Sequence, residues 1–368
     1  MGSLEMSGDP DMLENRETAG DDLQAELGGV LMRQRAFWLR TPVDRPLLRV
    51  APWQEYQPYP PFILRDGSAP AETYEITPGL LDPLASLQAT RPARLVDGDF
   101  IGGWGAYDQC WTEALLGCRV LRVGGSVWTE PFIHDWQDVD RLPAEGNEAW
   151  LDELLRVNQV LVEAVGGSYP VSQPLMRGPL DMAEAAMSSA MLYAGFYEAP
   201  ERLRSFLELC GGVFVQAARR RLDCTPPFHG GYAVRCEWGL WAPGTTVQFQ
   251  ADASRNLSEC MYREFLFEVD RMIAGAFEYP IMHTHSGSHH ILPVIMDIPE
   301  LRAIEVSLDP APYGPSPLDL LPEFEEVQRA GKSLLISGPM RQVELRVLLE
   351  RLSPVGLGIR AGLLPEPV

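Results

Sequence analysis

Four of the six histidines lie close together, in the stretch PIMHTHSGSHH that begins at Pro280. His283 and His285 are two residues apart at the end of an apolar run, so in a strand both rings point to the same side. Two imidazoles on one side can supply two ligands to a single ion. His289 and His290 follow the run, and we expect them in a loop or first helical turn, at the periphery of the site.

The His-x-His motif by itself leaves three interpretations open. The rings could bind a metal, form a metal-free polar site that hydrogen-bonds a substrate carbonyl or a carboxylate, or serve only the structure. For a metal, Glu305 on the next expected strand could supply the third ligand, and Asp309 at the end of that strand is an alternative. Two histidines and one carboxylate leave positions open for water or substrate. We predict a divalent metal, zinc, held by His283, His285 and Glu305.

A second polar stretch, FQADASRN, ends another β-like run just before a helix. Its Asp252 could be a general base, a metal ligand or a helix N-cap. We predict that Asp252 acts with His283 and His285 in catalysis. Trp238 and Trp241, in CEWGLWAPG, could wall a pocket, although packing in the core is the commoner use of tryptophan. The residues expected to contact substrate are Ser254, Arg255, Trp241, Asp309 and Arg360.

The elements that must position these residues alternate between strand and helix. The runs YPIMHTH, LRAIEVSLD, KSLLISGP and VGLGIRAG are separated by helical segments at about residues 291–300, 317–330 and 341–352. This order implies parallel strands with right-handed crossovers. An open doubly wound sheet and a closed barrel both fit, but no strand is followed by GxGxxG or GxxxxGK[ST]. We predict an α/β fold, a (β/α)8 TIM barrel, whose chemistry lies at the C-terminal ends of its strands.

The region before these strands is predicted to elaborate the barrel. RPLLRVAP, from Arg45, reads as a strand, and residues 117–133 read as a hairpin around Gly124 and Gly125. A helix is expected at residues 147–165 with Asn147 as its N-cap. Further helices are expected at residues 182–197, 200–222 and 257–276.

Composition restricts the partners. The chain of 368 residues carries a formal net charge of −21 and has no cluster of basic residues that would neutralise phosphate, so we expect no nucleic acid and no anionic membrane as partner. Residues 1–25 are acidic and polar and are predicted to form a disordered arm, followed by a single domain at residues 26–368. The six cysteines form no CxxC pair and no secretory signal is seen, which predicts reduced thiols, Cys224 and Cys236 among them, in a cytoplasmic protein.

Several stretches carry a family resemblance. GPLDMAEAAM, PGTTVQFQADASRNLSECMYREFLFEVDRMI and the series HTHSG, LRAIEVSLDP, GKSLLISGP, LLERLSPVGLGIRAG resemble, in that order, the uroporphyrinogen decarboxylase superfamily. The superfamily includes the decarboxylase, corrinoid-linked methyltransferases that pass methyl groups to a thiol, and cobalamin-independent methionine synthase. The resemblance covers about Arg45 to Gly362 and implies a TIM barrel.

The resemblance also shows where this chain departs from the family. Resemblance to the decarboxylase would imply a metal-free enzyme with an arginine-rich N-terminal motif. After Arg45 this chain instead reads PLLRVAPWQEYQPYP, which has no such motif. The thiol methyltransferases carry a zinc-binding His-x-Cys at the position of HTHSG and a further Cys near the last strand. His283 matches the first ligand, but His285 stands at the Cys position and the last strand, GLGIRAGLL, has no Cys. Imidazole in place of thiolate makes the ion a harder Lewis acid, suited to water or oxygen.

Three functions therefore remain as hypotheses. The first is metal-dependent methyl or one-carbon transfer at the barrel mouth, with a corrinoid on a partner protein as methyl donor or acceptor. The second is a metal-free decarboxylase or lyase, in which Arg235, Arg255 or Arg360 binds a substrate carboxylate. The third is a non-catalytic barrel that docks a corrinoid protein. By analogy with the superfamily the chain would be a homodimer.

Overall fold

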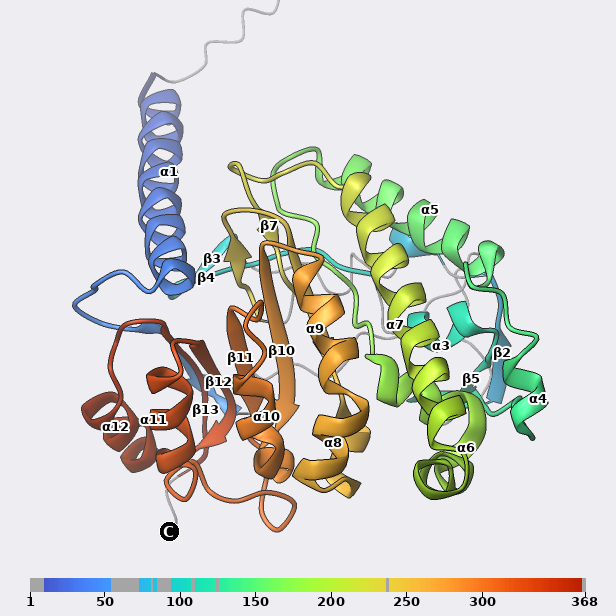
Figure 1. The fold of residues 1–368 in the computed structure, drawn as a ribbon. Coiled ribbons are helices and arrows are strands. Elements are labelled where there is room, and N and C mark those ends of the chain that lie inside the picture. The colour runs from blue at the N-terminus through green and yellow to red at the C-terminus, as the bar shows by residue number, and fades with distance from the viewer. Residues whose placement is uncertain are drawn as a thin grey trace, which may run out of the picture.

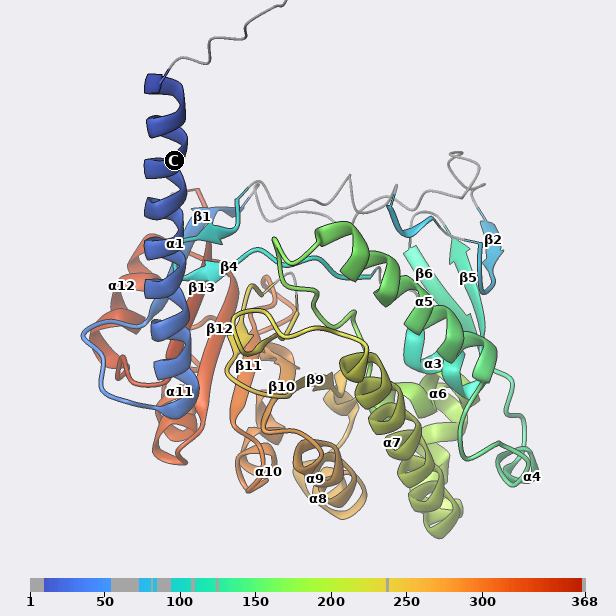
Figure 2. The same cartoon turned by 90° about the horizontal axis from the view of Figure 1, so that it is seen from above.

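The computed structural model describes residues 10–53, 73–80, 82–84, 94–106, 110–123, 126–235 and 238–365, with side chains from residue 24 onward. Its central element is a sheet of six parallel strands in the order β1-β13-β12-β11-β10-β9. Figure 2 shows these strands following an arc. Their bounds are β1 Leu47–Pro52, β9 Thr246–Gln250, β10 Tyr279–His285, β11 Ala303–Ser307, β12 Ser333–Met340 and β13 Leu357–Leu363.

Helices connect the strands of the C-terminal half and lie outside the arc (Figure 1). They are α8 Glu259–Phe265, α9 Phe267–Gly275, α10 Leu292–Met296, α11 Leu321–Arg329 and α12 Gln342–Arg351. The helix expected at residues 257–276 is divided at Leu266 into α8 and α9. Strand, helix and parallel strand alternate, which confirms the predicted α/β class.

Irregular segments lie between β1 and β9. The Asp99 amide donates to the Leu48 carbonyl of β1 at 3.2 Å, and Trp104 forms a parallel bridge with Val171. Gln173 then reaches β9: its Nε2 donates to the Gln248 carbonyl at 2.6 Å, and its Oε1 accepts from the Gln248 amide at 3.0 Å. Side-chain and isolated backbone contacts thus connect the two edges of the sheet.

Helices and a small antiparallel sheet cover the region between the edges. The predicted hairpin is confirmed as β5 Arg119–Val123 and β6 Ser126–Glu130, although its turn at residues 124–125 lies outside the described residues. The Asn147 cap is also confirmed, because its side chain accepts from the Ala149 and Trp150 amides. The remaining elements are β2 Thr73–Ile76, β3 Val96–Asp97, β4 Phe100–Ile101, α3 Trp111–Leu116, α4 Trp136–Val139, α5 Glu148–Val165, α6 Pro179–Glu198 and α7 Pro200–Asp223.

The first helix, α1 Pro10–Leu39, projects from the body and joins it at its C-terminal end (Figures 1 and 2). There Phe37 and Trp38 belong to a buried cluster with Ile281 of β10, Ala303 of β11 and Leu335 of β12. The cluster fills the concave side of the sheet near the N-terminal ends of its strands. The arm expected at residues 1–25 overlaps α1, and its residues 1–9 lie outside the described part.

Two short strands, β7 Tyr232–Ala233 and β8 Trp241–Ala242, pair beside this end of α1. The described helices include none that is both long and apolar enough to cross a membrane.

Candidate metal centre

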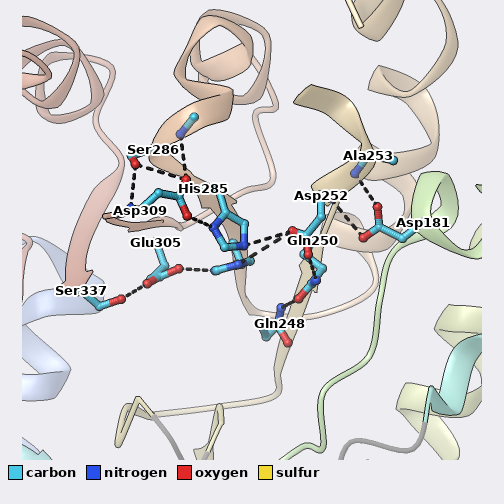
Figure 3. A network of polar contacts seen from close by, with 12 residues as sticks. Asp181, Gln248, Gln250, Asp252, Ala253, His285, Ser286, Glu305, Asp309 and Ser337 are labelled. Carbon is cyan, nitrogen blue, oxygen red and sulfur yellow. Dashed lines mark hydrogen bonds and ion pairs between the residues drawn. The ribbon is translucent and has the colours of Figure 1, made fainter. Parts of the chain in front are cut away.

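Three side chains meet where β9 and β10 end (Figure 3). His283 and His285 lie on one face of β10, with their ring centroids 4.9 Å apart. Asp252 opens the 3-10 turn Asp252–Asn256 that follows β9. Its Oδ1 lies 3.9 Å from His283 Nε2 and 3.8 Å from His285 Nε2. One ligand atom of each residue lies within 4.8 Å of the others, a spacing that could hold a metal ion.

A fully buried carboxyl lies behind His283. His283 Nδ1 hydrogen-bonds Glu305 Oε2, and Glu305 Oε1 accepts from the Ser337 hydroxyl of β12. Burial alone would lower the pKa of His283, but the carboxylates of Glu305 and Asp252 outweigh burial and hold that pKa above its ordinary value. Glu305 thus fixes the orientation of this ring.

His285 has a carboxylate behind it as well. Its Nδ1 lies 2.7 Å from Asp309 Oδ1. Asp309 Oδ2 accepts from the Gly287 amide at 3.1 Å, and the Asp309 amide donates to the Ser286 hydroxyl at 2.8 Å. Both histidines therefore present Nε2 toward Asp252 while Nδ1 binds a carboxylate.

One oxygen of Asp252 has no hydrogen-bond partner among the described residues. This oxygen, Oδ1, is buried. Asp181, near the start of α6, accepts from the Asp252 and Ala253 amides at 3.1 and 2.8 Å. Burial and the charge of Asp252 raise the pKa of Asp181 well above its ordinary value. This buried carboxyl anchors the backbone of Asp252.

The donor set fits a divalent metal. A histidine that donates its Nδ1 proton to a carboxylate keeps the lone pair on Nε2 for a ligand, an arrangement common around protein-bound metals. Two imidazole nitrogens and one carboxylate oxygen suit zinc or a similar transition-metal ion. Such an ion would also satisfy the unpaired Asp252 Oδ1.

Glu305 is not part of this cluster, and its role as the third ligand stays a prediction. Glu305 stands beside His283 in the register of β10 and β11, so it meets the ring nitrogen nearer the backbone. Asp252 lies beyond the end of β9 and faces the outer nitrogens of both rings. The carboxylate placed to be a ligand is therefore Asp252, which the sequence left open between base, ligand and cap.

The residues expected to bind substrate are only partly brought together. Asp309 supports His285, and Arg255 lies nearby, where its Nη2 donates to the Tyr313 carbonyl at 3.0 Å. Ser254 is fully buried in the turn after Asp252. Arg360 is paired with Ser337 in the register of β12 and β13, so both side chains lie on the same face of the sheet.

Trp241 lies elsewhere, so the prediction that it contacts substrate is not supported. It is buried in a cluster with Leu27 and Val30 of α1, and its indole donates to the Phe228 carbonyl at 2.7 Å. Trp238 is the tryptophan near the site: its ring lies 5.8 Å from that of His283. The sequence offered both tryptophans as pocket walls, and the expected substrate contact was assigned to Trp241.

The remaining candidates are peripheral. His289 Nδ1 lies 3.0 Å from the Ser286 carbonyl, and His290 Nε2 lies 2.8 Å from the Leu257 carbonyl, as expected for residues beside the site. Cys224 is an exposed free thiol, and Cys236 lies outside the described residues.

Comparison with known proteins gives a likeness of fold. No family model matches the chain. No curated protein matches it in sequence. Among solved structures, a methyltransferase from Methanosarcina mazei is similar, with a TM-score of 0.60 and 15% sequence identity over 92% of this chain and 94% of that chain. The likeness supports a methyltransferase-like fold, whereas membership of the uroporphyrinogen decarboxylase superfamily stays a prediction.

Proposed function

We propose that this chain is a metal-dependent enzyme of methyl or one-carbon transfer. The convergence of Asp252 Oδ1, His283 Nε2 and His285 Nε2 carries the proposal, because each histidine is already oriented by a carboxylate. The fold it shares with a methyltransferase adds the reaction class. The metal we favour is zinc.

We further propose that the sheet is part of a (β/α)8 barrel, with residues 26–368 as one domain. The segments around Asp99–Trp104 and Val171–Gln173 would be the second and third strands, because they follow β1 in the chain and link it to β9. The metal centre would then lie at the barrel mouth, where the C-terminal ends of the strands meet.

Each residue of the site would have a separate role in the reaction. A metal ion held there would act as a Lewis acid that polarises a heteroatom of the methyl acceptor. His283 and His285 would bind the ion through Nε2, while Glu305 and Asp309 orient their rings through Nδ1. Trp238 packs beside His283 and shields it on that side. The acceptor lone pair forms the new bond to the methyl carbon as the bond to the donor breaks. A corrinoid on a partner protein is the donor we favour.

Metal analysis of the purified protein tests the proposal. We expect about one equivalent of zinc, or of iron or manganese, in the wild type, and its loss in His283→Ala. His134→Ala is the matched control, because His134 is exposed and outside the cluster. A metal-free wild type that cannot be loaded, or a His283→Ala variant that retains stoichiometric metal, would contradict the proposal.

A metal-free decarboxylase or lyase is the second candidate, favoured by the arginines. Arg235 is only 7% exposed and stacks on Trp238, with its Cζ 5.6 Å from the ring centroid. Its charge opposes protonation of His283, which places it within electrostatic reach of that ring. With Arg360 it could bind a substrate carboxylate. This candidate predicts turnover that chelators leave unchanged and that Arg235→Ala abolishes.

A further inference from the structure

The two oxygens of Asp252 are not equivalent. Oδ2 accepts a hydrogen bond from Gln250 Nε2 at 2.7 Å, whereas Oδ1 faces both histidines without a hydrogen-bond partner in the described part of the chain. Gln250 lies on the face of β9 that also carries Gln248, and it is only 3% exposed. A bond to one oxygen leaves the other as the atom that can meet an ion.

The orientation of Gln250 follows from its neighbours (Figure 3). An ionised carboxylate only accepts hydrogen bonds, so Gln250 must direct its amide nitrogen toward Asp252. Its oxygen then faces Gln248, whose Nε2 donates to it at 3.3 Å. Gln248 is fully buried, and the side chain of Gln173 binds both its backbone amide and its carbonyl. The side chains of Gln248 and Gln250 thus donate in series, and the series ends on Asp252 Oδ2.

The backbone of Asp252 is held separately. Asp181 accepts from the amides of Asp252 and Ala253, and the Gly178 amide donates to the Gln250 carbonyl at 3.0 Å. A Cβ on Gly178 would lie 2.1 Å from that carbonyl oxygen, so α6 approaches the end of β9 closely. With the backbone fixed, rotation of the carboxylate is the main freedom left to Asp252, and Gln250 acts on that freedom.

We infer that Gln250 is a positioning residue that keeps Asp252 a one-oxygen ligand. The inference rests on the proposed metal-binding function. While Gln250 donates to Oδ2, a bound ion would receive one carboxylate oxygen and two imidazole nitrogens, and positions would stay open for substrate. Without Gln250, the carboxylate is free to bind through both oxygens or to turn away.

Titration of the metal-depleted protein with Co²⁺ alone tests the inference. Gln250→Met keeps a similar side-chain length but cannot donate. We expect its dissociation constant for Co²⁺ to rise about 10- to 100-fold, the range usual for partners that orient metal ligands, and the visible absorption of the Co²⁺ complex to change. Gln248→Met should give a smaller rise in the same direction, because it removes only the support of Gln250.

Thr284→Val is the matched control. Thr284 lies between the two histidines on the opposite face of β10, and its hydroxyl has no hydrogen-bond partner among the described residues. We expect wild-type Co²⁺ affinity and spectrum. A folded Gln250→Met variant that keeps the wild-type affinity and spectrum would overturn the inference. If Gln250→Met does not unfold cooperatively, wild-type Co²⁺ affinity and spectrum in Gln248→Met would overturn the inference instead.

The two proposals fail in different ways. If the wild type itself binds no Co²⁺, the metal-dependent function is wrong. If the wild type binds Co²⁺ with a defined spectrum and the glutamine variants do so equally, the metal centre stands and the role of Gln250 is refuted.

Discussion

Each of the two histidines contacts a carboxylate through Nδ1, but the two rings differ in burial. The His283 side chain is 9% exposed, and its partner Glu305 is fully buried between β10 and β12. The His285 side chain is 38% exposed, and its partner Asp309 is 17% exposed in a loop after β11. A hydrogen bond to a buried carboxylate has no water to replace it, whereas one at the surface does. In the proposed metal centre, His283 would therefore be the more rigidly held ligand and His285 the more mobile one.

Removing either imidazole should have the largest effect on metal binding. The two variants also test whether the two rings differ. We expect His283→Ala to abolish stoichiometric metal binding and turnover. In His285→Ala we expect weakened binding with metal recoverable at high metal concentration, because Asp252 and His283 remain in place. Metal titration of both variants checks this order, and equal losses would show that burial does not distinguish them.

Asp270 shows the effect of burial on the pKa of a carboxyl that has no histidine partner. Asp270 of α9 is buried against the Tyr262 hydroxyl, and burial raises its pKa to about 7. An acid whose pKa is higher in the folded state binds more protons there than in the unfolded state. Stability should therefore fall as the pH rises from about 4 to about 7, by an amount on the order of 4 kcal/mol.

Asp270→Asn tests this expectation. The amide cannot ionise, so the fall in the free energy of unfolding between about pH 4 and 7 should be reduced relative to the wild type. Denaturant unfolding at a series of pH values measures both slopes. Identical slopes would mean that Asp270 is not the titrating group.

Glu305 and Asp309, the carboxylate partners of the two rings, should differ in how strongly they affect metal binding. We expect Glu305→Gln to weaken metal binding by about 100-fold and Asp309→Asn by about 10-fold, the two ends of the usual range for such residues. Glu305 lies where water cannot replace it, whereas Asp309 is reached by solvent. Competition with a chelator of known affinity measures both constants. A larger loss in Asp309→Asn would reverse the comparison.

The hydroxyls behind the carboxylates should give the smallest effects. Ser337→Ala leaves a buried Glu305 oxygen unpaired and should cost about 1–3 kcal/mol of stability. Ser286→Ala removes the acceptor of the Asp309 amide and should cost less, about 1 kcal/mol, because this contact is only partly buried and water can replace the hydroxyl. Thermal unfolding of the metal-free variants gives both values, and Ser286→Ala as the costlier change would count against the ranking.

The C-terminal half of the fold could be predicted because its strands are short apolar runs separated by helical patterns. The spacing of His283 and His285 likewise placed both rings on one face of β10, as observed. Spacing within one strand is a local property that the period of two determines.

The rest depends on relations between distant segments. Glu305 proved to be a partner of Nδ1 because of the register between β10 and β11, which no single strand encodes. Asp181 contacts the amide of Asp252 across a separation of 71 residues. It lies in GPLDMAEAAM, one of the stretches that carry the family resemblance, but that resemblance assigned it no role. Gln250 could have been noticed, since it lies two residues before Asp252, but only its bond to Oδ2 gives that spacing a meaning.

The pairing of the first strand with the last has a consequence for biosynthesis. Leu47 of β1 lies beside Gly358 of β13, so the hydrogen-bonding edge of β1 finds this partner only after the residues of β13 have left the ribosome. Until then β1 presents an open edge to other nascent chains. A stop codon or deletion that removes only residues 357–368 would spare Asp252, His283 and His285. It would still leave β1 and β12 without their shared neighbour, and we expect such a product to aggregate.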